Sequence, residues 1–277
     1  MFDLSDKVVL VTGGAGLLGR MHSEAIVANG GKVIVGDIDI ESAEKTCKEI
    51  NKLFSPVRRS TGALVGPEFS YDPPLEKAFP AYLNVLDKTS IQSVLDEYSD
   101  INILINNAAI DPKVTDTTGP SGSFESLSIE EWDLSVDVMM KGTFLCSQVF
   151  CPHFKNNGGG IVINISSDLG VIAPDQRIYE GSKKPITYSA AKHGIIGMTK
   201  YLATYYADSN IRVNSLSPGG VYVNQPEDFV ERLTNLIPVG RMANRDEYKG
   251  SIVFLCSDAS SYMTGHNLIV DGGRTVW

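Results

Sequence analysis

Residues 7–19 have the sequence KVVLVTGGAGLLG, in which an apolar run passes directly into a turn with four glycines. The apolar run predicts a buried strand at residues 8–12, and the residues after the turn predict a helix at 18–29. Glycines at such a junction let the backbone approach a pyrophosphate, whose charge is met by free N–H groups at the helix N-terminus. A turn that serves only packing is the alternative.

The alternation of strand and helix continues to the end of the chain. It predicts a single doubly wound α/β domain over residues 1–277, with a parallel sheet of the Rossmann type. Right-handed crossovers then bring the carboxyl ends of the strands to one edge, where ligands bind. The expected strands are at 8–12, 32–36, 81–85, 101–106, 160–166, 211–217 and 267–270, and the expected helices are at 18–29, 40–53, 129–154, 188–208 and 245–257.

Two segments interrupt this rhythm. Residues 55–80 carry five prolines and have no clean periodicity, so we expect an excursion over the surface there. Residues 168–187 form a second insertion between a strand and a helix. Neither segment has the composition of a linker to another domain.

Composition excludes several classes of protein. The net charge of −9 and the pI near 5.0 argue against a nucleic-acid binder, which needs a basic face. The apolar runs are far shorter than a membrane helix, and the N-terminus has no signal-peptide pattern, so we expect a cytoplasmic protein. Four cysteines without CxxC spacing predict buried, reduced thiols and no metal site.

Asp37 gives the glycine turn a second indication of function. It ends the second expected strand, 18 positions after Gly19, close to the spacing of about 20 at which a carboxylate reaches a ribose 2′-hydroxyl. A carboxylate there accepts from a free hydroxyl and repels a 2′-phosphate, so NAD is favoured over NADP. In the alternative, Asp37 caps the next helix, a task that Asp39 can also perform.

The segment Asn106-Asn107-Ala108-Ala109 follows the fourth expected strand. Small side chains leave room for a nucleotide against the sheet edge, and asparagine amides can tie neighbouring strands together. For Asn106 a purely structural role and a ligand contact both stay open.

Tyr188-Ser189-Ala190-Ala191-Lys192 is the most informative segment for chemistry. The i, i+4 spacing puts the phenol and the ammonium on one helix face. A nearby cation favours the phenolate, which brings a tyrosine closer to proton transfer at neutral pH. Because such pairs are common on helix surfaces, the pair gains meaning from Ser166-Ser167, which ends an apolar strand and can orient a substrate oxygen.

These motifs occur in one order along nearly the whole chain, which thereby resembles the short-chain dehydrogenase/reductase family. The resemblance also covers residues 214–219 and the terminal Asp271-Gly272-Gly273. It implies that Tyr188 is the general acid/base, that Lys192 lowers the pKa of Tyr188 and holds the nicotinamide ribose, and that Ser167, rather than Ser166, polarises the substrate oxygen. Pro218, Gly219 and the following backbone would flank the nicotinamide.

The expected function is therefore the NAD-dependent interconversion of an alcohol and a carbonyl compound by hydride transfer. Alongside the NAD, the expected partner is a small-molecule substrate. The family also implies a homodimer or homotetramer built on the helices at 129–154 and 188–208. The residues expected at the cofactor are Gly13, Gly16, Leu17, Leu18, Gly19, Asp37, Ile38, Asn84, Val85, Asn107, Ala108, Ala109, Tyr188, Lys192, Pro218, Gly219 and Val221.

Several positions depart from the family pattern. Leu17 replaces a glycine of the usual short-chain turn, which gives the TGxxGxxG form of longer relatives. Met139 stands where the family has a catalytic asparagine that supports a proton-relaying water, and methionine cannot do this. Asn84 replaces an aspartate near the adenine. Val223 replaces a threonine that contacts the carboxamide, a contact that Asn224 would take over.

The insertion at 168–187 suggests a substrate class. Its basic residues Arg177, Lys183 and Lys184 are expected to attract an anionic substrate such as a sugar phosphate, or else to be solvated. Residues 217–227 resemble relatives linked to bacterial surface-glycan or flagellin modification. Two alternatives stay open: a nucleotide-binding scaffold with weak catalysis, suggested by Met139, and an NAD-using epimerase or dehydratase, suggested by the TGxxGxxG turn.

Overall fold

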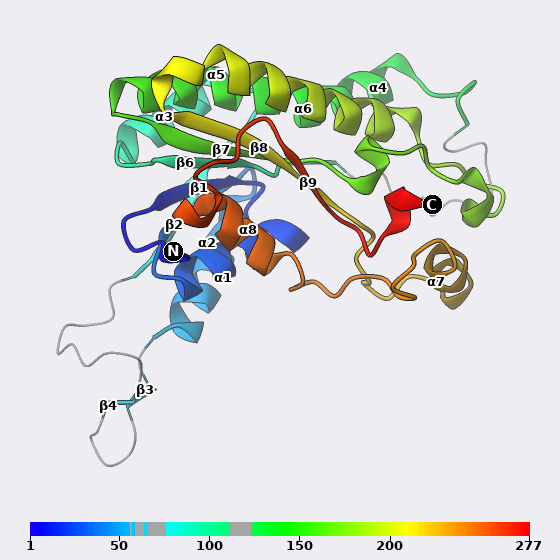
Figure 1. Cartoon of the computed structure of the whole chain (residues 1–277), viewed down its shortest axis with the longest axis horizontal. Helices are drawn as coiled ribbons and strands as arrows, with labels where there is room; N and C mark the ends of the chain where they lie inside the picture. Colours follow the sequence, from blue (N-terminus) through cyan, green and yellow to red (C-terminus); the bar gives the residue numbers. More distant parts are fainter. Residues whose placement is uncertain (56, 59–63, 66–75, 111–122) are drawn as a thin grey trace.

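The apolar strands form one parallel sheet (Figure 1). The computed structural model describes residues 1–55, 57–58, 64–65, 76–110 and 123–277. Its seven-stranded sheet has the order β5-β2-β1-β6-β7-β8-β9, with parallel pairing throughout. The doubly wound α/β fold is thereby confirmed. The strands are β1 (Val8–Thr12), β2 (Lys32–Asp37), β5 (Ala78–Tyr82), β6 (Ile103–Asn106), β7 (Gly160–Ile165), β8 (Ile211–Pro218) and β9 (Asn267–Val270).

Helices cover both faces of this sheet (Figure 1). The helices α1 (Leu17–Ala28), α2 (Ile40–Leu53) and α8 (Lys249–Cys256) pack on one face. The opposite face carries α3 (Lys88–Glu97), α5 (Gly142–Asn156) and α6 (Ile186–Tyr205). Because both faces are covered, the strands are apolar on both sides, which is why they read as continuous apolar runs.

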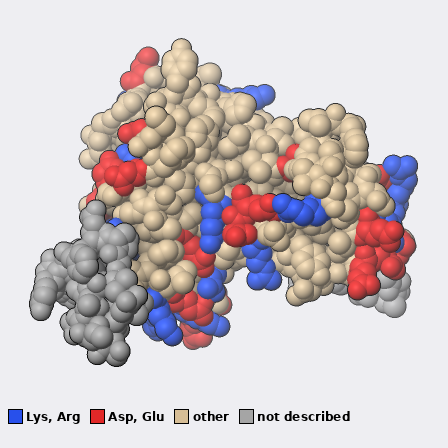
Figure 2. Space-filling view, turned by 60° about the horizontal axis from the view of Figure 1, so that its bottom comes forward, with Lys and Arg blue, Asp and Glu red and all other residues tan. Residues whose placement is uncertain are grey.

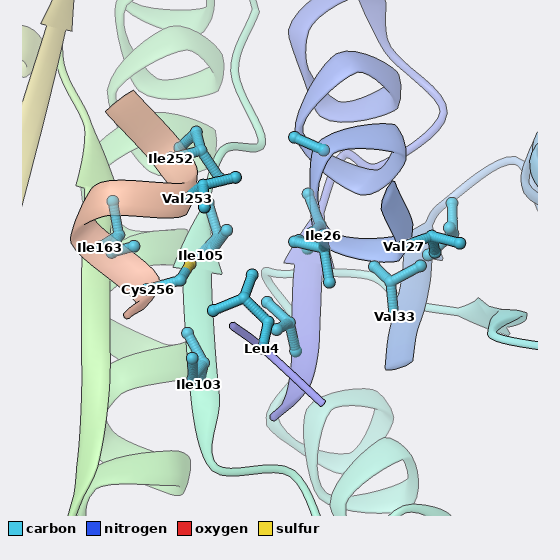
Figure 3. Packing of buried hydrophobic residues seen from close by; sticks show 14 of the residues in the cluster. Leu4, Ile26, Val27, Val33, Ile103, Ile105, Ile163, Ile252, Val253 and Cys256 are labelled. Carbon is cyan, nitrogen blue, oxygen red and sulfur yellow. The ribbon is translucent and has the colours of Figure 1, made fainter. Parts of the chain in front are cut away.

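The two cores alternate residue by residue along each strand. In β1, Val9 and Val11 face α1 and α8, whereas Leu10 faces α3 and α5. Figure 3 shows the first core, with Ile26 of α1 and Ile252 of α8 packed above the strands. Each fully buried aliphatic side chain of this kind contributes about 1.5–3 kcal/mol. All four cysteines are buried and unpaired, as expected.

The third predicted strand was misplaced. It runs from Ala78 to Tyr82 rather than over 81–85, in register with β2 from Val33 to Asp37. The prolines suggested that the surface excursion lasts to Pro80, but Pro80 lies inside β5. This strand is the edge of the sheet, where a residue without an N–H is tolerated. Within the excursion, β3 (Val57–Arg58) and β4 (Leu64–Val65) pair antiparallel; most of its remaining residues lie outside the described part of the chain.

The long helix predicted at 129–154 is divided. It consists of α4 (Ile129–Val136), a π-helical segment at Asp137–Lys141, and α5. Among the other helices, α6 begins at Ile186 after Pro185 and ends at Tyr205, before the predicted 208. The last predicted helix begins at Lys249 rather than 245. Two helices, α3 and α7 (Glu227–Thr234), were not predicted.

The topology creates a crevice between β1 and β6. From β1 the chain proceeds outward to β2 and β5, and then returns to β6 on the other side of β1. Ligands of open α/β sheets bind at the carboxyl ends of the strands at such a switch point. Here Oγ1 of Thr12 accepts from the backbone N–H groups of Asn107 and Ala108, each at 3.0 Å, which joins the two strand ends.

His22 makes the stability of the fold sensitive to acid. Its ring is fully buried in α1, and among the described residues neither nitrogen has a partner. Burial lowers the pKa of His22 to about 3, against about 6.5 in an unfolded chain. Between these two pH values the unfolded chain binds a proton that the folded chain does not, so stability falls as the pH falls.

We therefore expect the free energy of unfolding to drop by about 2 kcal/mol more in the wild type than in His22→Leu between pH 7 and pH 5. Urea unfolding of both proteins at both pH values measures this difference. Equal drops in the two proteins would contradict the assignment.

Candidate active site

A cavity of about 750 Å³ opens at the carboxyl ends of the central strands. It collects nearly all of the residues that the sequence predicted for a cofactor and for catalysis. Gly19 is the exception among them. The predicted residues in its lining are Gly13, Gly16, Leu17, Leu18, Asp37, Ile38, Asn84, Val85, Asn107, Ala108, Ala109, Ser167, Tyr188, Lys192, Pro218, Gly219 and Val221.

The glycine turn leaves the N-terminus of α1 open to this cavity. Gly16 is the N-cap residue, has extended backbone, and supplies no side chain to cap the first N–H groups. Gly16, Leu17 and Leu18 line the cavity. The unsatisfied N–H groups and the positive end of the helix dipole suit a phosphate.

Gly19 packs closely against the glycine turn and does not line the cavity. A Cβ atom there would lie 2.3 Å from the carbonyl oxygen of Gly13 and 2.9 Å from Nδ2 of Asn107. Asn107 in turn donates to the carbonyl oxygens of Thr12 and Gly13, each at 3.0 Å. Close packing of helix against turn therefore requires a glycine here, and a direct cofactor contact of Gly19 stays a prediction.

Asp37 lies at the end of β2 and does not cap α2. The N-cap is Asp39, which accepts from the backbone N–H of Ser42 at 3.1 Å, so the capping alternative for Asp37 is wrong. The Asp37 carboxylate accepts from the backbone N–H groups of Ala15 and Asp39, each at 3.1 Å. It is thus fixed at the rim of the cavity, beside the glycine turn.

For Asn106 a structural role and a ligand contact were both open, and the structure supports the structural role. It is buried, and its Nδ2 donates to Oδ1 of Asn164 at 2.8 Å. Nδ2 of Asn164 donates onward to Oγ1 of Thr199 in α6 at 2.9 Å. This buried chain of polar groups links β6, β7 and α6, and Asn106 does not line the cavity.

Tyr188 and Lys192 extend from the first turns of α6 into the cavity. Lys192 is 3% exposed, and its Nζ donates to the carbonyl oxygen of Ile165 at 2.8 Å. The same ammonium lies 5.6 Å from the centroid of the Tyr188 ring. A buried cation at this distance stabilises negative charge on the phenol oxygen.

The two serines after β7 have different partners. Oγ of Ser166 donates to the carbonyl oxygen of Lys192 at 2.8 Å and so holds α6. Oγ of Ser167 donates to Oδ1 of Asp168 at 2.8 Å and accepts from the N–H of Leu169 at 3.2 Å. Both line the cavity, but Ser166 uses its only hydroxyl proton on the backbone of α6.

Met139 lies in the π-helical segment, fully buried against Ala191, Ile195 and Tyr188. Its thioether fills apolar space in this cluster and offers no strong hydrogen-bonding group.

Val223 is another position that departs from the expected pattern. The cavity is lined there by Val223 and Gln225 and not by Asn224. Asn224 has a left-handed backbone with φ of 63°, and its contact with the carboxamide stays a prediction.

The segment at 168–187 brings one of its three predicted cations into the cavity. Nζ of Lys184 lies 4.3 Å from the centroid of the Tyr188 ring. The amide of Gln176 holds the Lys184 backbone through two hydrogen bonds of 2.9 and 3.1 Å. Arg177 instead pairs with Asp175 and is 88% exposed, and neither Arg177 nor Lys183 lines the cavity.

Several residues of the lining were missed from the sequence. They come from segments far apart in the chain, and their signals are weak because each is a single charged, aromatic or apolar side chain outside any motif. A buried tyrosine, Tyr248, also supports the site by donating to the carbonyl oxygen of Gly219 at 2.9 Å. The missed residues of the lining include Asp168, Tyr179, Phe229, Leu233, Met242 and Arg274.

Known proteins are similar to this chain in sequence and in fold. A family model described as Enoyl-(Acyl carrier protein) reductase matches residues 76–275. A trans-4-hydroxycyclohexanecarboxylate dehydrogenase from Sinomonas cyclohexanicum is 32% identical over 98% of this chain and 94% of its own length. A 3-oxoacyl-(acyl-carrier-protein) reductase from Thermotoga maritima is 31% identical over 99% of both chains. A short chain dehydrogenase from Leptospira borgpetersenii, solved with bound NAD⁺, is 33% identical over 99% of this chain and 94% of that one, with a TM-score of 0.79.

Gly19→Ala tests the packing of the turn. Because the added Cβ would meet backbone atoms, the turn must shift, and the dissociation constant for NADH is expected to rise at least about tenfold, equivalent to 1.4 kcal/mol. Titration of the protein with NADH, followed by fluorescence, gives the constant.

Gly250→Ala is the matched control, since a Cβ there has nothing within 4 Å among the described atoms. We expect it to leave the dissociation constant unchanged. If Gly19→Ala and Gly250→Ala bind NADH equally well, the turn does not need its close packing.

Proposed function

The chain belongs to the short-chain dehydrogenase/reductase family, and from this premise we propose that it interconverts an alcohol and a carbonyl compound by hydride transfer to or from NAD. The single observation that carries the proposal is the meeting of Tyr188, Lys192 and Ser167 in one cavity with the glycine turn and Asp37. Catalytic and cofactor-binding groups thus share a single space.

The residues of the cavity fit a dinucleotide. The N-terminus of α1 is open for a pyrophosphate, Asp37 is fixed at the rim for a ribose, and small or apolar side chains lie between them. Gly13, Ala108 and Ala109 would border the phosphates and ribose, Asn84 and Val85 the adenine, and Pro218, Gly219 and Val221 the nicotinamide. Bound NAD supplies the hydride carrier.

Proton transfer belongs to the chain itself. In alcohol oxidation the Tyr188 phenolate accepts the hydroxyl proton, and in carbonyl reduction the phenol returns it. Lys192, whose Nζ lies 5.6 Å from the centroid of the Tyr188 ring, stabilises the phenolate and would hold the nicotinamide ribose. Ser167 donates to the substrate oxygen, whereas Ser166 holds α6.

NAD is the proposed cofactor rather than NADP. The Asp37 carboxylate is held at the rim of the cavity by two backbone N–H groups. A free 2′-hydroxyl donates to it, but a 2′-phosphate is repelled by its charge. The Leptospira borgpetersenii structure, which holds NAD⁺, is 33% identical to this chain.

The proposed substrate is a sugar or sugar phosphate. Support comes from Lys184, whose ammonium lies over the Tyr188 ring within the cavity and would attract an anionic group. The name of the Sinomonas cyclohexanicum relative also describes an anionic alcohol, a hydroxycyclohexanecarboxylate. A link to surface-glycan or flagellin modification stays a prediction from residues 217–227.

A nucleotide-binding scaffold with weak catalysis is the second candidate. Met139 favours it, because its buried thioether stands where the family uses an asparagine for proton relay. An NAD-using epimerase or dehydratase would form product without net NADH. Assays with a panel of alcohols and ketones separate the three, since the scaffold binds NAD without turnover.

A homodimer or homotetramer in the cytoplasm is the proposed state. Exposed Phe144, Tyr201 and Tyr205 lie on α5 and α6, the helices expected at the interface.

On the face in Figure 2, acidic and basic side chains are interspersed, which does not suit a nucleic-acid partner. Every helix within the described residues is too short or too polar to cross a membrane.

Tyr188→Phe removes the hydroxyl that exchanges the proton and keeps the ring. We expect kcat to fall by about 10²–10⁴-fold, with the dissociation constant for NADH nearly unchanged. Steady-state kinetics and NADH titration measure the two quantities. Tyr201→Phe, an exposed tyrosine of the same helix, is the control, and near-normal turnover in Tyr188→Phe would refute the role.

Asp37→Ala tests the cofactor preference. Without the carboxylate, the ratio of kcat/KM for NAD to that for NADP is expected to fall at least about tenfold, or 1.4 kcal/mol. Asp39→Ala is the matched control, because it removes the cap of α2 at a cost of about 1 kcal/mol and leaves Asp37 in place. A ratio that moves equally in both variants would count against Asp37 as the selector.

A further inference from the structure

A buried ion pair lies in the wall of the cavity, next to Ser167. Nη1 of Arg274 donates to Oδ2 of Asp168 at 2.6 Å, and the two side chains are 6% and 4% exposed. Both residues line the cavity. Removing two charges from water costs several kcal/mol per ion, so a buried pair is weak evidence for stability. Its position beside reactive groups indicates a role in the reaction.

Asp168 connects this pair to the hydroxyl of Ser167. Its Oδ1 accepts from Oγ of Ser167 and from the N–H of Leu169, each at 2.8 Å. The Ser167 oxygen itself accepts from the same N–H at 3.2 Å. A hydroxyl has one proton and two lone pairs. The hydroxyl proton of Ser167 is therefore directed at Asp168 in a hydrogen bond, and one lone pair of the Ser167 oxygen remains for another group.

The end of the chain directs Arg274 to this point. The Asp271 carboxylate accepts from the N–H groups of Gly273 at 2.9 Å and Thr275 at 2.7 Å. Gly273 has φ of 89°, and a Cβ there would lie 2.9 Å from the Pro238 ring. The indole of Trp277 donates to the carbonyl oxygen of Leu236 at 2.9 Å. These contacts fix the last turn, so the guanidinium is preorganised.

We propose that Asp168 and Arg274 are positioning residues for the oxidoreductase reaction and act through the Ser167 hydroxyl. The inference rests on the proposed function. Asp168 orients the hydroxyl before substrate binds, and the proton then turns to the substrate oxygen. Arg274 compensates the charge of Asp168. This weakens the hydrogen bond from Ser167 to the carboxylate, so that the hydroxyl can turn to the substrate. Without Arg274, the uncompensated carboxylate holds the proton in a stronger, charge-assisted hydrogen bond.

Arg274→Gln, made with Ser167 present and in a Ser167→Ala background, tests this mechanism. With Ser167 present, kcat for carbonyl reduction is expected to fall about tenfold or more, while KM for NADH stays within about twofold. In the Ser167→Ala background, the same substitution is expected to lower the residual kcat less than about threefold, because the hydroxyl it acts through is gone.

Two further variants separate positioning from structural damage. Adding Asp168→Asn to Arg274→Gln removes the charge that needs compensation, and it is expected to restore part of kcat. Arg274→Lys keeps the cation, and it is expected to retain most of kcat. Arg241→Gln, which removes a more exposed pair with Glu247, is the control and is expected to leave kcat unchanged.

Equal losses from Arg274→Gln in the two Ser167 backgrounds would overturn the inference, and so would no loss with Ser167 present. If Arg274→Gln does not fold, the Asp168→Asn/Arg274→Gln pair is compared in the two backgrounds by the same criterion. A wild type that turns over no alcohol or ketone would contradict the proposed function, and this inference with it. An active wild type with equal losses contradicts the inference alone.

Discussion

Two buried hydrogen bonds fasten α6 to the end of β7, and the candidate site depends on them. The Ser166 hydroxyl donates to the Lys192 carbonyl oxygen, and the Lys192 ammonium donates to the carbonyl oxygen of Ile165. Both bonds lie in the interior, where an unpaired polar group costs about 1–3 kcal/mol. Lys192 therefore cannot turn to solvent. Because Tyr188 lies one turn earlier on the same helix, the phenol and the ammonium are presented together to the cavity.

The parallel sheet brings the other half of the site to the same place. The carboxyl ends of β1, β2, β6, β7 and β8 share one edge, so residues widely separated in sequence border one space. Thr12 joins β1 to β6 at the switch point, and Asn107 holds the glycine turn there. The cofactor side of the cavity is thus rigid for the same reason as the catalytic side: backbone carbonyl oxygens and N–H groups hold its walls.

Local sequence patterns predict most of the fold and of the candidate site. The features that they do not predict depend on long-range contacts. The glycine turn, Asp37 and the Tyr188–Lys192 spacing are signals within one or two elements, and the site residues predicted from them, except Gly19, line the cavity. Pro80 was misjudged because its place in an edge strand depends on tertiary structure, and so does the close packing around Gly19. The contact of Asp168 with Arg274 spans 106 positions. No periodicity in either segment indicates such a pair, and the π-helical segment around Met139 likewise interrupts a pattern that predicts one continuous helix.

A crystal structure of the protein with NAD and an alcohol or ketone would test the proposed arrangement of Tyr188, Ser167 and the cofactor. We expect the nicotinamide between the backbone of Pro218 and Gly219 and the Tyr188 side chain, with the substrate oxygen within hydrogen-bond distance of both the Tyr188 phenol and the Ser167 hydroxyl. A dinucleotide bound elsewhere, or a Tyr188 phenol turned away from the nicotinamide and the substrate, would contradict it.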